Sequence, residues 1–156
     1  MAGGTSSDDF DAVALDGIWR IEGPGTASVG LSTSSTDAFV EIEVAAGVDY
    51  DAWGTNTTAR LMQEASNEDL VVSAGFLSTP TQRYQIQGLL FEEDADDFLR
   101  FDVHSQGSRL YAFASINDGG TPAAQIYTRI NPADAEHLRV QRSGDTWTYQ
   151  ASPDGT

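Results

Sequence analysis

Residues 92–97, EEDADD, place five carboxylates in six positions between two apolar runs. Two carboxylates about 5 Å apart on one rigid strand can hydrolyse a glycosidic bond, provided that one of them is dry enough to stay protonated. The positions of Glu92, Asp94 and Asp97 along the chain are similar to those of such a carboxylate pair, but the segment has no large apolar residue that could bury it. We therefore predict that EEDADD is the solvated tip of a β-hairpin and that the protein is not an enzyme.

Calcium is the second chemistry that an acidic loop could support, because hard cations take several oxygen ligands from such loops. Calcium loops usually combine carboxylates with backbone carbonyls in a turn fixed by Gly or Asn, and EEDADD contains neither residue. The segment DDFD at residues 8–11 is another acidic candidate. Two alternatives remain for these acidic segments: they bind Ca²⁺ as a cofactor, or they are solvated turns of an acidic protein. The ligands of such a metal site are unknown.

The overall charge limits the classes of partner. The chain has 24 acidic residues against 8 basic ones, and its net charge of −16 repels phosphate backbones and anionic membrane surfaces. We therefore expect neither a nucleic-acid partner nor a membrane partner. All basic residues are arginines, and this Lys-free, acidic composition suits a marine or halophilic protein or an ordinary acidic secreted domain.

Targeting and redox signals are absent from the sequence. There is no cysteine, so neither a disulfide nor a Cys-ligated zinc site can form. No stretch approaches the roughly 20 apolar residues of a membrane span. The segment MAGGTSSDDFD lacks the basic end and the apolar run of a secretory signal.

The hydrophobic pattern has a period of two, which is typical of β-strands. In FLRFDV, the apolar Leu99, Phe101 and Val103 alternate with Arg100 and Asp102. Turn signals rich in Gly, Pro, Asn and Asp separate several such segments. We predict an all-β fold, a two-sheet antiparallel sandwich or jelly roll, with a disordered tail at residues 1–7 and a single domain at residues 8–156.

Two polar rows could form a ligand-binding face. Gln85 and Gln87 point the same way from one predicted strand, and Arg100, Asp102 and His104 point the same way from the next. Side by side, the rows would form one polar patch that could bind sugar hydroxyls. The alternative is a solvated outer face held together by Arg100 and Asp102. With only two histidines, the sequence offers no transition-metal site.

Trp53 is the aromatic candidate for stacking on a sugar ring, with Asn56 close behind it in the sequence. The alternative for Trp53 is a plug at the end of the sandwich core. Trp19 and Trp147 lie in strand patterns, and we expect both in the core.

Four segments, in order, resemble the concanavalin A-like lectin/glucanase superfamily: IWRIEGPG, YDAWGTNTTARLMQ, YQIQGLLFEEDADDFLRFDVHS and HLRVQRSGDTWTYQASPDG. Within it, the chain is most similar to non-catalytic sandwich modules, such as the C-terminal domain of family 43 β-xylosidases and the regulation-of-enolase family. The resemblance covers most of residues 8–156. Arg60 and Gln63 match its W-G-T-N-x-x-x-R-L-x-Q element; the alternative for Arg60 is an internal pair with a carboxylate.

The resemblance implies a concanavalin A-like jelly roll with carbohydrate on its concave sheet, in an extracellular or cell-surface protein. The expected ligand residues are Trp53, Asn56, Arg60, Gln63, Gln85, Gln87, Arg100 and His104. Related domains usually continue with further strands after the S-x-D-G corner, whereas this chain stops at Thr156. The alternative function is therefore an interaction module whose open sheet edge is completed by a partner strand or a separate C-terminal segment. A glycoside hydrolase is the third alternative.

Overall fold

The computed structural model describes residues 5–156, and these residues form strands, turns and one short 3-10 helix. The predicted all-β class is confirmed. The chain divides into two compact units, the first ending at Asn67 and the second running from Glu68 to Thr156. Residues 1–4 of the expected disordered tail lie outside the described residues.

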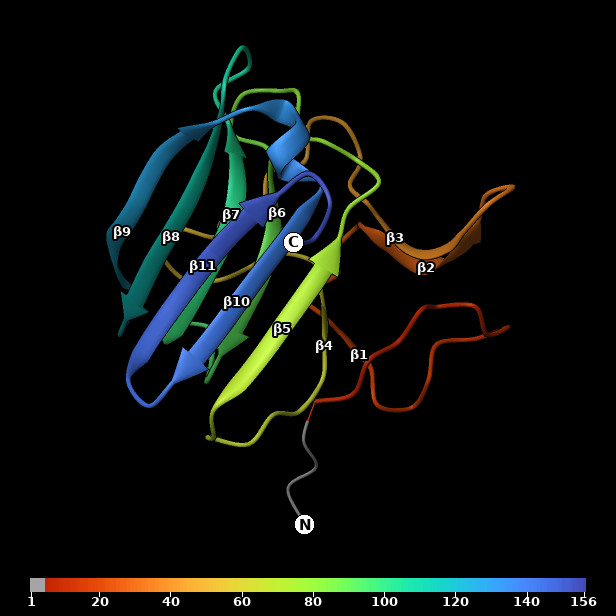
Figure 1. The fold of residues 1–156 in the computed structure, drawn as a ribbon, viewed down its shortest axis with the longest axis horizontal. Helices are drawn as coiled ribbons and strands as arrows, with labels where there is room; N and C mark the ends of the chain where they lie inside the picture. Colours follow the sequence, from red (N-terminus) through yellow and green to blue (C-terminus); the bar gives the residue numbers. More distant parts are fainter. Residues whose placement is uncertain (1–4) are drawn as a thin grey trace. The chain divides into compact units, whose positions relative to one another are not determined.

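The first unit contains two small antiparallel sheets. One pairs β1 (Arg20–Glu22) with β4 (Arg60–Met62), and the other pairs β2 (Ser28–Thr33) with β3 (Ala38–Glu43). The second sheet is a hairpin, because its two strands are consecutive in the chain (Figure 1). Strand β4 lies within the segment TTARLMQ.

The second unit contains seven strands and the 3-10 helix. In chain order these are β5 (Leu70–Gly75), β6 (Ile86–Glu92), β7 (Phe98–Ser105), β8 (Leu110–Asp118), β9 (Thr121–Ile130), η1 (Pro132–Ala135), β10 (His137–Ser143) and β11 (Thr146–Ser152). They form a four-stranded sheet in the order β6-β7-β8-β9 and a three-stranded sheet in the order β11-β10-β5. Every strand pairing in this unit is antiparallel. Antiparallel neighbours can be joined by short turns.

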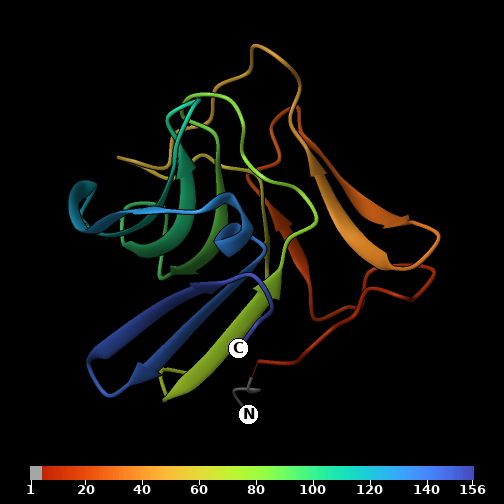
Figure 2. The same cartoon turned by 45° about the horizontal axis from the view of Figure 1, so that its top comes forward.

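The two sheets of the second unit face each other and enclose its core (Figure 2). One core cluster joins Val103 and Leu110 of the four-stranded sheet to Leu138 of the three-stranded sheet. A second cluster joins Phe101 to Val140 in the same way. Along β7, Phe101 and Val103 alternate with Arg100 and Asp102, so the period-two pattern correctly predicted the core row of this strand.

Aromatic rings fill the second cluster. The centroid of the Trp147 ring lies 4.8 Å from that of Phe91 and 5.8 Å from that of Phe101. The Tyr149 hydroxyl donates a hydrogen bond across the core to the backbone carbonyl of Asp102, at 2.9 Å. Trp147 therefore packs against the core as expected, and Tyr149 links the two sheets.

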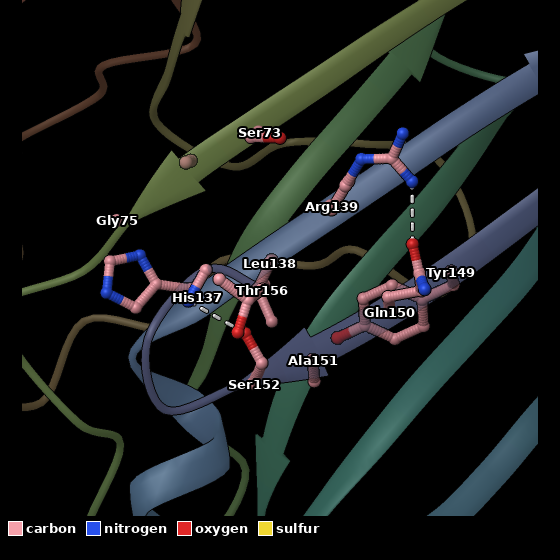
Figure 3. A pocket seen from close by; sticks show the side chains of 12 residues that line it. Ser73, Gly75, His137, Leu138, Arg139, Tyr149, Gln150, Ala151, Ser152 and Thr156 are labelled. Carbon is pink, nitrogen blue, oxygen red and sulfur yellow. Dashed lines mark hydrogen bonds between the residues drawn. The ribbon is translucent and has the colours of Figure 1, made fainter.

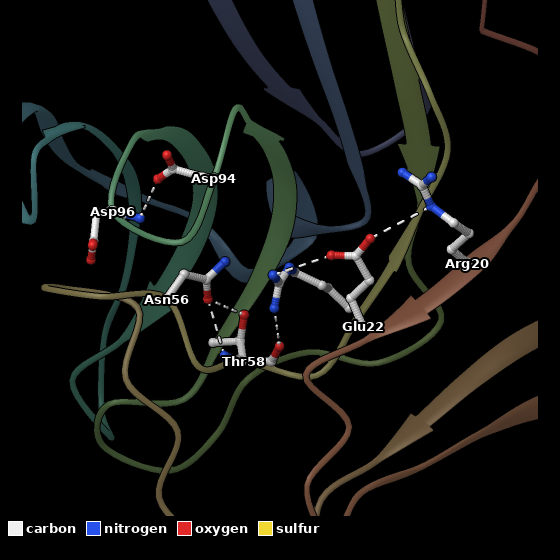
Figure 4. Close-up of polar contacts among 7 residues, drawn as sticks. Arg20, Glu22, Asn56, Thr58, Asp94 and Asp96 are labelled. Carbon is white, nitrogen blue, oxygen red and sulfur yellow. Dashed lines mark hydrogen bonds and ion pairs between the residues drawn. The ribbon is translucent and has the colours of Figure 1, made fainter.

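The acidic segment EEDADD joins β6 to β7 in an antiparallel hairpin, as predicted. The Oδ1 atom of Asp94 accepts a hydrogen bond from the backbone amide of Asp96, at 2.8 Å (Figure 4). It accepts a second one from the amide of Asp97, at 3.0 Å. Asp97 in turn accepts a hydrogen bond from the amide of Gly119 at 2.8 Å. Two of the five carboxylates thus stabilise turns of the backbone.

In residues 5–156, no helix has the length and apolar character needed to cross a membrane.

Candidate functional site

The face of the four-stranded sheet that lies opposite the core carries the polar row of β7. Arg100, Asp102 and His104 lie on this second face, as the alternation predicted. Gln87, however, pairs with Val103 and lies on the core side, while Gly88 pairs with Asp102. The prediction that the glutamine row and the arginine row form one patch is therefore wrong. The register of the β6–β7 hairpin decides this, because one residue more or fewer in its loop would exchange the two faces.

The two glutamines hold a loop in place. The side chain of Gln87 accepts a hydrogen bond from the Ser78 hydroxyl at 3.0 Å and donates one to the Ser78 carbonyl at 2.7 Å. The Oε1 atom of Gln85 accepts hydrogen bonds from the amides of Thr81 and Gln82, both at 2.9 Å. Both side chains are engaged within the second unit, which gives them a structural role.

Arg100 and Asp102 form a buried ion pair. Arg100 is 7% exposed and Asp102 is 3% exposed, and their Nε and Oδ2 atoms are 2.6 Å apart. The guanidinium also lies over the ring of Phe113, at 4.6 Å from its centroid. Burial raises the pKa of Asp102 to about 6, although the charge of Arg100 and its hydrogen bond act in the opposite direction. The expected solvated or ligand-facing row is thus buried at these two positions.

At the Ser105 end of β7, the same face carries four rings that we call the tyrosine cluster: Tyr84, His104, Tyr111 and Tyr127. The rings of Tyr111 and Tyr127 are stacked, with centroids 4.4 Å apart and an interplanar angle of 4°. His104 lies edge-on to Tyr84 at 6.2 Å and to Tyr127 at 6.1 Å. Tyr84 is 65% exposed and Tyr127 is 51% exposed, so the cluster presents aromatic surface to solvent.

Polar groups border the tyrosine cluster. The side-chain amide nitrogen of Gln106 donates a hydrogen bond to the hydroxyl of Tyr127 at 3.1 Å and lies 3.0 Å from Nε2 of His104. The guanidinium of Arg83 lies 4.7 Å from the centroid of the Tyr84 ring. Burial, followed by the charge of Arg100, lowers the pKa of His104 below its ordinary value. A neutral imidazole can both donate and accept a hydrogen bond, as recognition of a hydroxyl requires.

The other sequence candidates belong to the first unit. Trp53 is 48% exposed. The buried Asn56 accepts hydrogen bonds from the amide and hydroxyl of Thr58, at 3.0 and 2.6 Å. Arg60 donates to the Thr58 carbonyl at 3.0 Å and pairs with Glu22 at 3.4 Å, so the internal ion pair considered as its alternative is observed (Figure 4).

Gln63 exchanges two hydrogen bonds with the backbone of Ser6, at 2.8 and 3.0 Å. Like Asn56 and Arg60, it takes part in the internal structure of the first unit. Of the predicted ligand residues, only His104 lies in the tyrosine cluster, and the four of the first unit lie in a separate compact body.

The tyrosines themselves were not predicted as ligands. The signal was present in β8, where Tyr111 and Phe113 alternate with the core residues Leu110, Ala112 and Ala114. Tyr84 gave no such signal, because it lies in the loop before β6, outside the strand alternation.

Among residues 5–156, no three or more His, Cys, Asp or Glu side chains are grouped so that they could hold a metal ion. Comparison of the chain with family models, with curated proteins and with solved structures gives no match.

Proposed function

We propose that this protein is a non-catalytic carbohydrate-binding module of an extracellular or cell-surface protein, with a concanavalin A-like jelly-roll fold. The tyrosine cluster would be the binding surface. Carbohydrate recognition combines aromatic rings, which stack on the apolar faces of sugars, with planar polar groups that bond their hydroxyls. The exposed tyrosines, together with His104, Gln106 and Arg83, provide both kinds of group at one end of the four-stranded sheet.

The observation that carries this proposal is the backbone of Tyr84. This residue has a φ of 70°, in the left-handed region that bulky residues rarely adopt. Such a conformation costs roughly 1–3 kcal/mol and persists only where the surrounding structure enforces it. The amide of Tyr84 donates to the carbonyl of Ser105 at 2.8 Å, which fixes the strained residue beside His104. The strain leaves a large aromatic side chain exposed, where folding stability gains little from it.

Two carboxylates of the second unit, those of Asp102 and Asp94, have structural partners, which supports a binding rather than a catalytic role for these two residues. Asp102 is paired with Arg100, and Asp94 accepts two backbone hydrogen bonds in its turn. Calcium stays part of the proposal as an optional cofactor, which a comparison of binding with and without EDTA would test.

Affinity gels containing different polysaccharides test the proposal. We expect retardation of the wild-type protein by at least one glycan, and a loss of affinity of about tenfold or more, or 1.4 kcal/mol, in Tyr84→Ala and Tyr127→Ala. Trp53→Ala is the matched control, since it removes a comparably exposed ring from the first unit. Unchanged retardation in both tyrosine variants would overturn the proposed surface, and a loss confined to Trp53→Ala would transfer the site to the first unit.

Strand addition is the second candidate function. Strand β9, Thr121–Ile130, ends the order of the four-stranded sheet and pairs only with β8 among the described residues. It is ten residues long and its one charged residue is Arg129, whereas edge strands are usually short or heavily charged. A complementing strand would bond its free backbone groups. Slower hydrogen exchange of the β9 amides on adding an excess of a candidate peptide would support this function, and unchanged exchange would oppose it.

A further inference from the structure

The outer face of the three-stranded sheet carries a hollow of about 480 Å³, which both polar and apolar residues line (Figure 3). We call it the arginine hollow, and its polar lining includes Ser73, His137, Arg139, Gln150, Ser152 and Thr156. These side chains come from three strands and from the turn after β11. All of them belong to the second unit, on the sheet opposite to the one that carries the tyrosine cluster.

The alternation of β10 explains why this face is polar. Leu138 and Val140 face the core, so His137, Arg139 and Gln141 must point outward. The register places Arg139 between Ser73 of β5 and Gln150 of β11. Ser73, Arg139 and Gln150 therefore form a row of hydrogen-bonding side chains across the three strands.

Neutral groups hold the guanidinium of Arg139. Its Nη1 atom donates to Oε1 of Gln150 at 2.7 Å and its Nη2 atom donates to Oε1 of Gln141 at 3.3 Å. Amide oxygens fix the orientation of the group without cancelling its charge. Arg20, Arg60 and Arg100 all pair with carboxylates, whereas Arg139 has no carboxylate within 4.0 Å in the part of the chain that the structure describes. The charge of Arg139 is therefore not neutralised by a carboxylate in contact with it.

Two glycines lie beside His137. A Cβ atom on Gly75 would lie 3.4 Å from Cε1 of the imidazole, and one on Gly155 would lie 3.5 Å from its Nδ1. The acidic residue in this turn, Asp154, accepts hydrogen bonds from the amide and hydroxyl of Thr156, at 3.1 and 2.7 Å. These bonds lower the pKa of Asp154, so its carboxylate stays ionised and engaged with Thr156.

We propose that the arginine hollow binds the carboxylate of a hydroxyl-rich ligand, that is, a uronate. A planar carboxylate matches the planar donors of a guanidinium. The imidazole and hydroxyl groups around Arg139 can bond the ring hydroxyls of the ligand. One arginine in a protein of net charge −16 favours a monoanion over a phosphate dianion. This site is separate from the tyrosine cluster and does not depend on the proposed function of that cluster.

Calorimetric titration of the whole chain with glucuronate, glucose and inorganic phosphate tests the proposal. We expect glucuronate to bind and glucose and phosphate to bind at least tenfold more weakly. Arg139→Gln should weaken glucuronate binding by at least tenfold, and Arg139→Lys should recover only part of it. Arg109→Gln is the control, since it makes the same change of charge in the exposed β7–β8 turn and should bind normally. Tyr84→Ala should also bind glucuronate normally.

Several results would overturn the proposal. These are equal binding of glucose and glucuronate, tighter binding of phosphate, unchanged binding in Arg139→Gln, or an equal loss in Arg109→Gln. Amide chemical shifts of the wild-type protein give an answer that does not depend on whether a variant folds. Glucuronate should shift the resonances of Ser73, His137, Arg139 and Gln150, and shifts elsewhere alone would contradict the site. Titration with oligogalacturonate then distinguishes a free uronate from a unit of an acidic polysaccharide, because a chain that fits should bind more tightly than its monomer.

Discussion

Strands β7 and β10 share a local pattern, an arginine between two apolar residues, but the two arginines have different kinds of partner. Leu99-Arg100-Phe101 in β7 and Leu138-Arg139-Val140 in β10 both direct a central arginine away from the core of the second unit. Arg100 is buried and pairs with the carboxylate of Asp102 at 2.6 Å. Arg139 is half-buried and is held by two amide oxygens.

The difference shows that burial selects the chemistry of the partner. A charge removed from water needs an opposite charge and hydrogen bonds beside it. A charge that still reaches water can be held by neutral acceptors and keeps its capacity to bind an ion from solution. The same three-residue pattern therefore gives a structural ion pair in β7 and a candidate ligand site in β10.

Removing each arginine gives the largest expected contrast. Arg100→Met should reduce the free energy of unfolding at pH 7 by about 3–5 kcal/mol, because it leaves Asp102 buried and unpaired. Arg139→Met should reduce it by about 1 kcal/mol or less, since only hydrogen bonds to neutral amides are lost. Urea titrations of both variants measure the two losses. The double variant Arg100→Met with Asp102→Asn should recover much of the first loss, and equal losses in the two single variants would contradict the comparison.

The pH dependence of stability tests the buried carboxylate itself. Asp102 ordinarily titrates at 3.8 and in the folded protein at about 6, so between these pH values the folded state binds more protons than the unfolded state. Acidification from pH 7 to 4 should therefore stabilise the wild type relative to Asp102→Asn, by up to about 3 kcal/mol at 1.4 kcal/mol per pH unit.

The lowered pKa of His104 has the opposite sign, because the unfolded state then binds more protons and acidification is destabilising. Both proteins retain His104, so its effect largely cancels in their difference. Urea titrations at several pH values measure that difference. Parallel stability curves for the wild type and Asp102→Asn would show that Asp102 has an ordinary pKa.

Substitutions of two glycines, one in the strand paired with β7 and one in a strand paired with β10, have the smallest expected effects on stability. Gly88 lies opposite Asp102, and a Cβ atom there would lie 2.6 Å from Cβ of Asp102 and would collide with the Phe101 carbonyl oxygen. Gly88→Ala should lower stability by about 1–3 kcal/mol, because the paired strands must separate. Gly75 lies opposite His137, where the added Cβ atom would make an ordinary 3.4 Å contact. Gly75→Ala should change the melting temperature far less, and similar shifts in both variants would contradict this account.

The strand pattern and the acidic hairpin could be predicted because both are local. Alternation along FLRFDV places the apolar Phe101 and Val103 on one face of the strand, and that face is the core face in the structure. The burial of Arg100 could not be read in the same way, since alternation assigns a side chain to a face without showing whether that face is covered. The candidate site was largely missed for a related reason: Tyr84, Tyr111 and Tyr127 are far apart in the sequence, and only the register and the loop before β6 bring them together.

The sequence alone determined the all-β class, the inward row of β7, the hairpin at EEDADD and a strongly negative charge. These follow from side-chain chemistry and a backbone period of two residues. Tertiary structure decided which glutamines and arginines share a face, which arginine is buried and which stays accessible, and where the tyrosines meet. Those properties depend on hairpin register and on packing between distant strands, and a shift of one residue in register would reverse the face of every side chain in a strand.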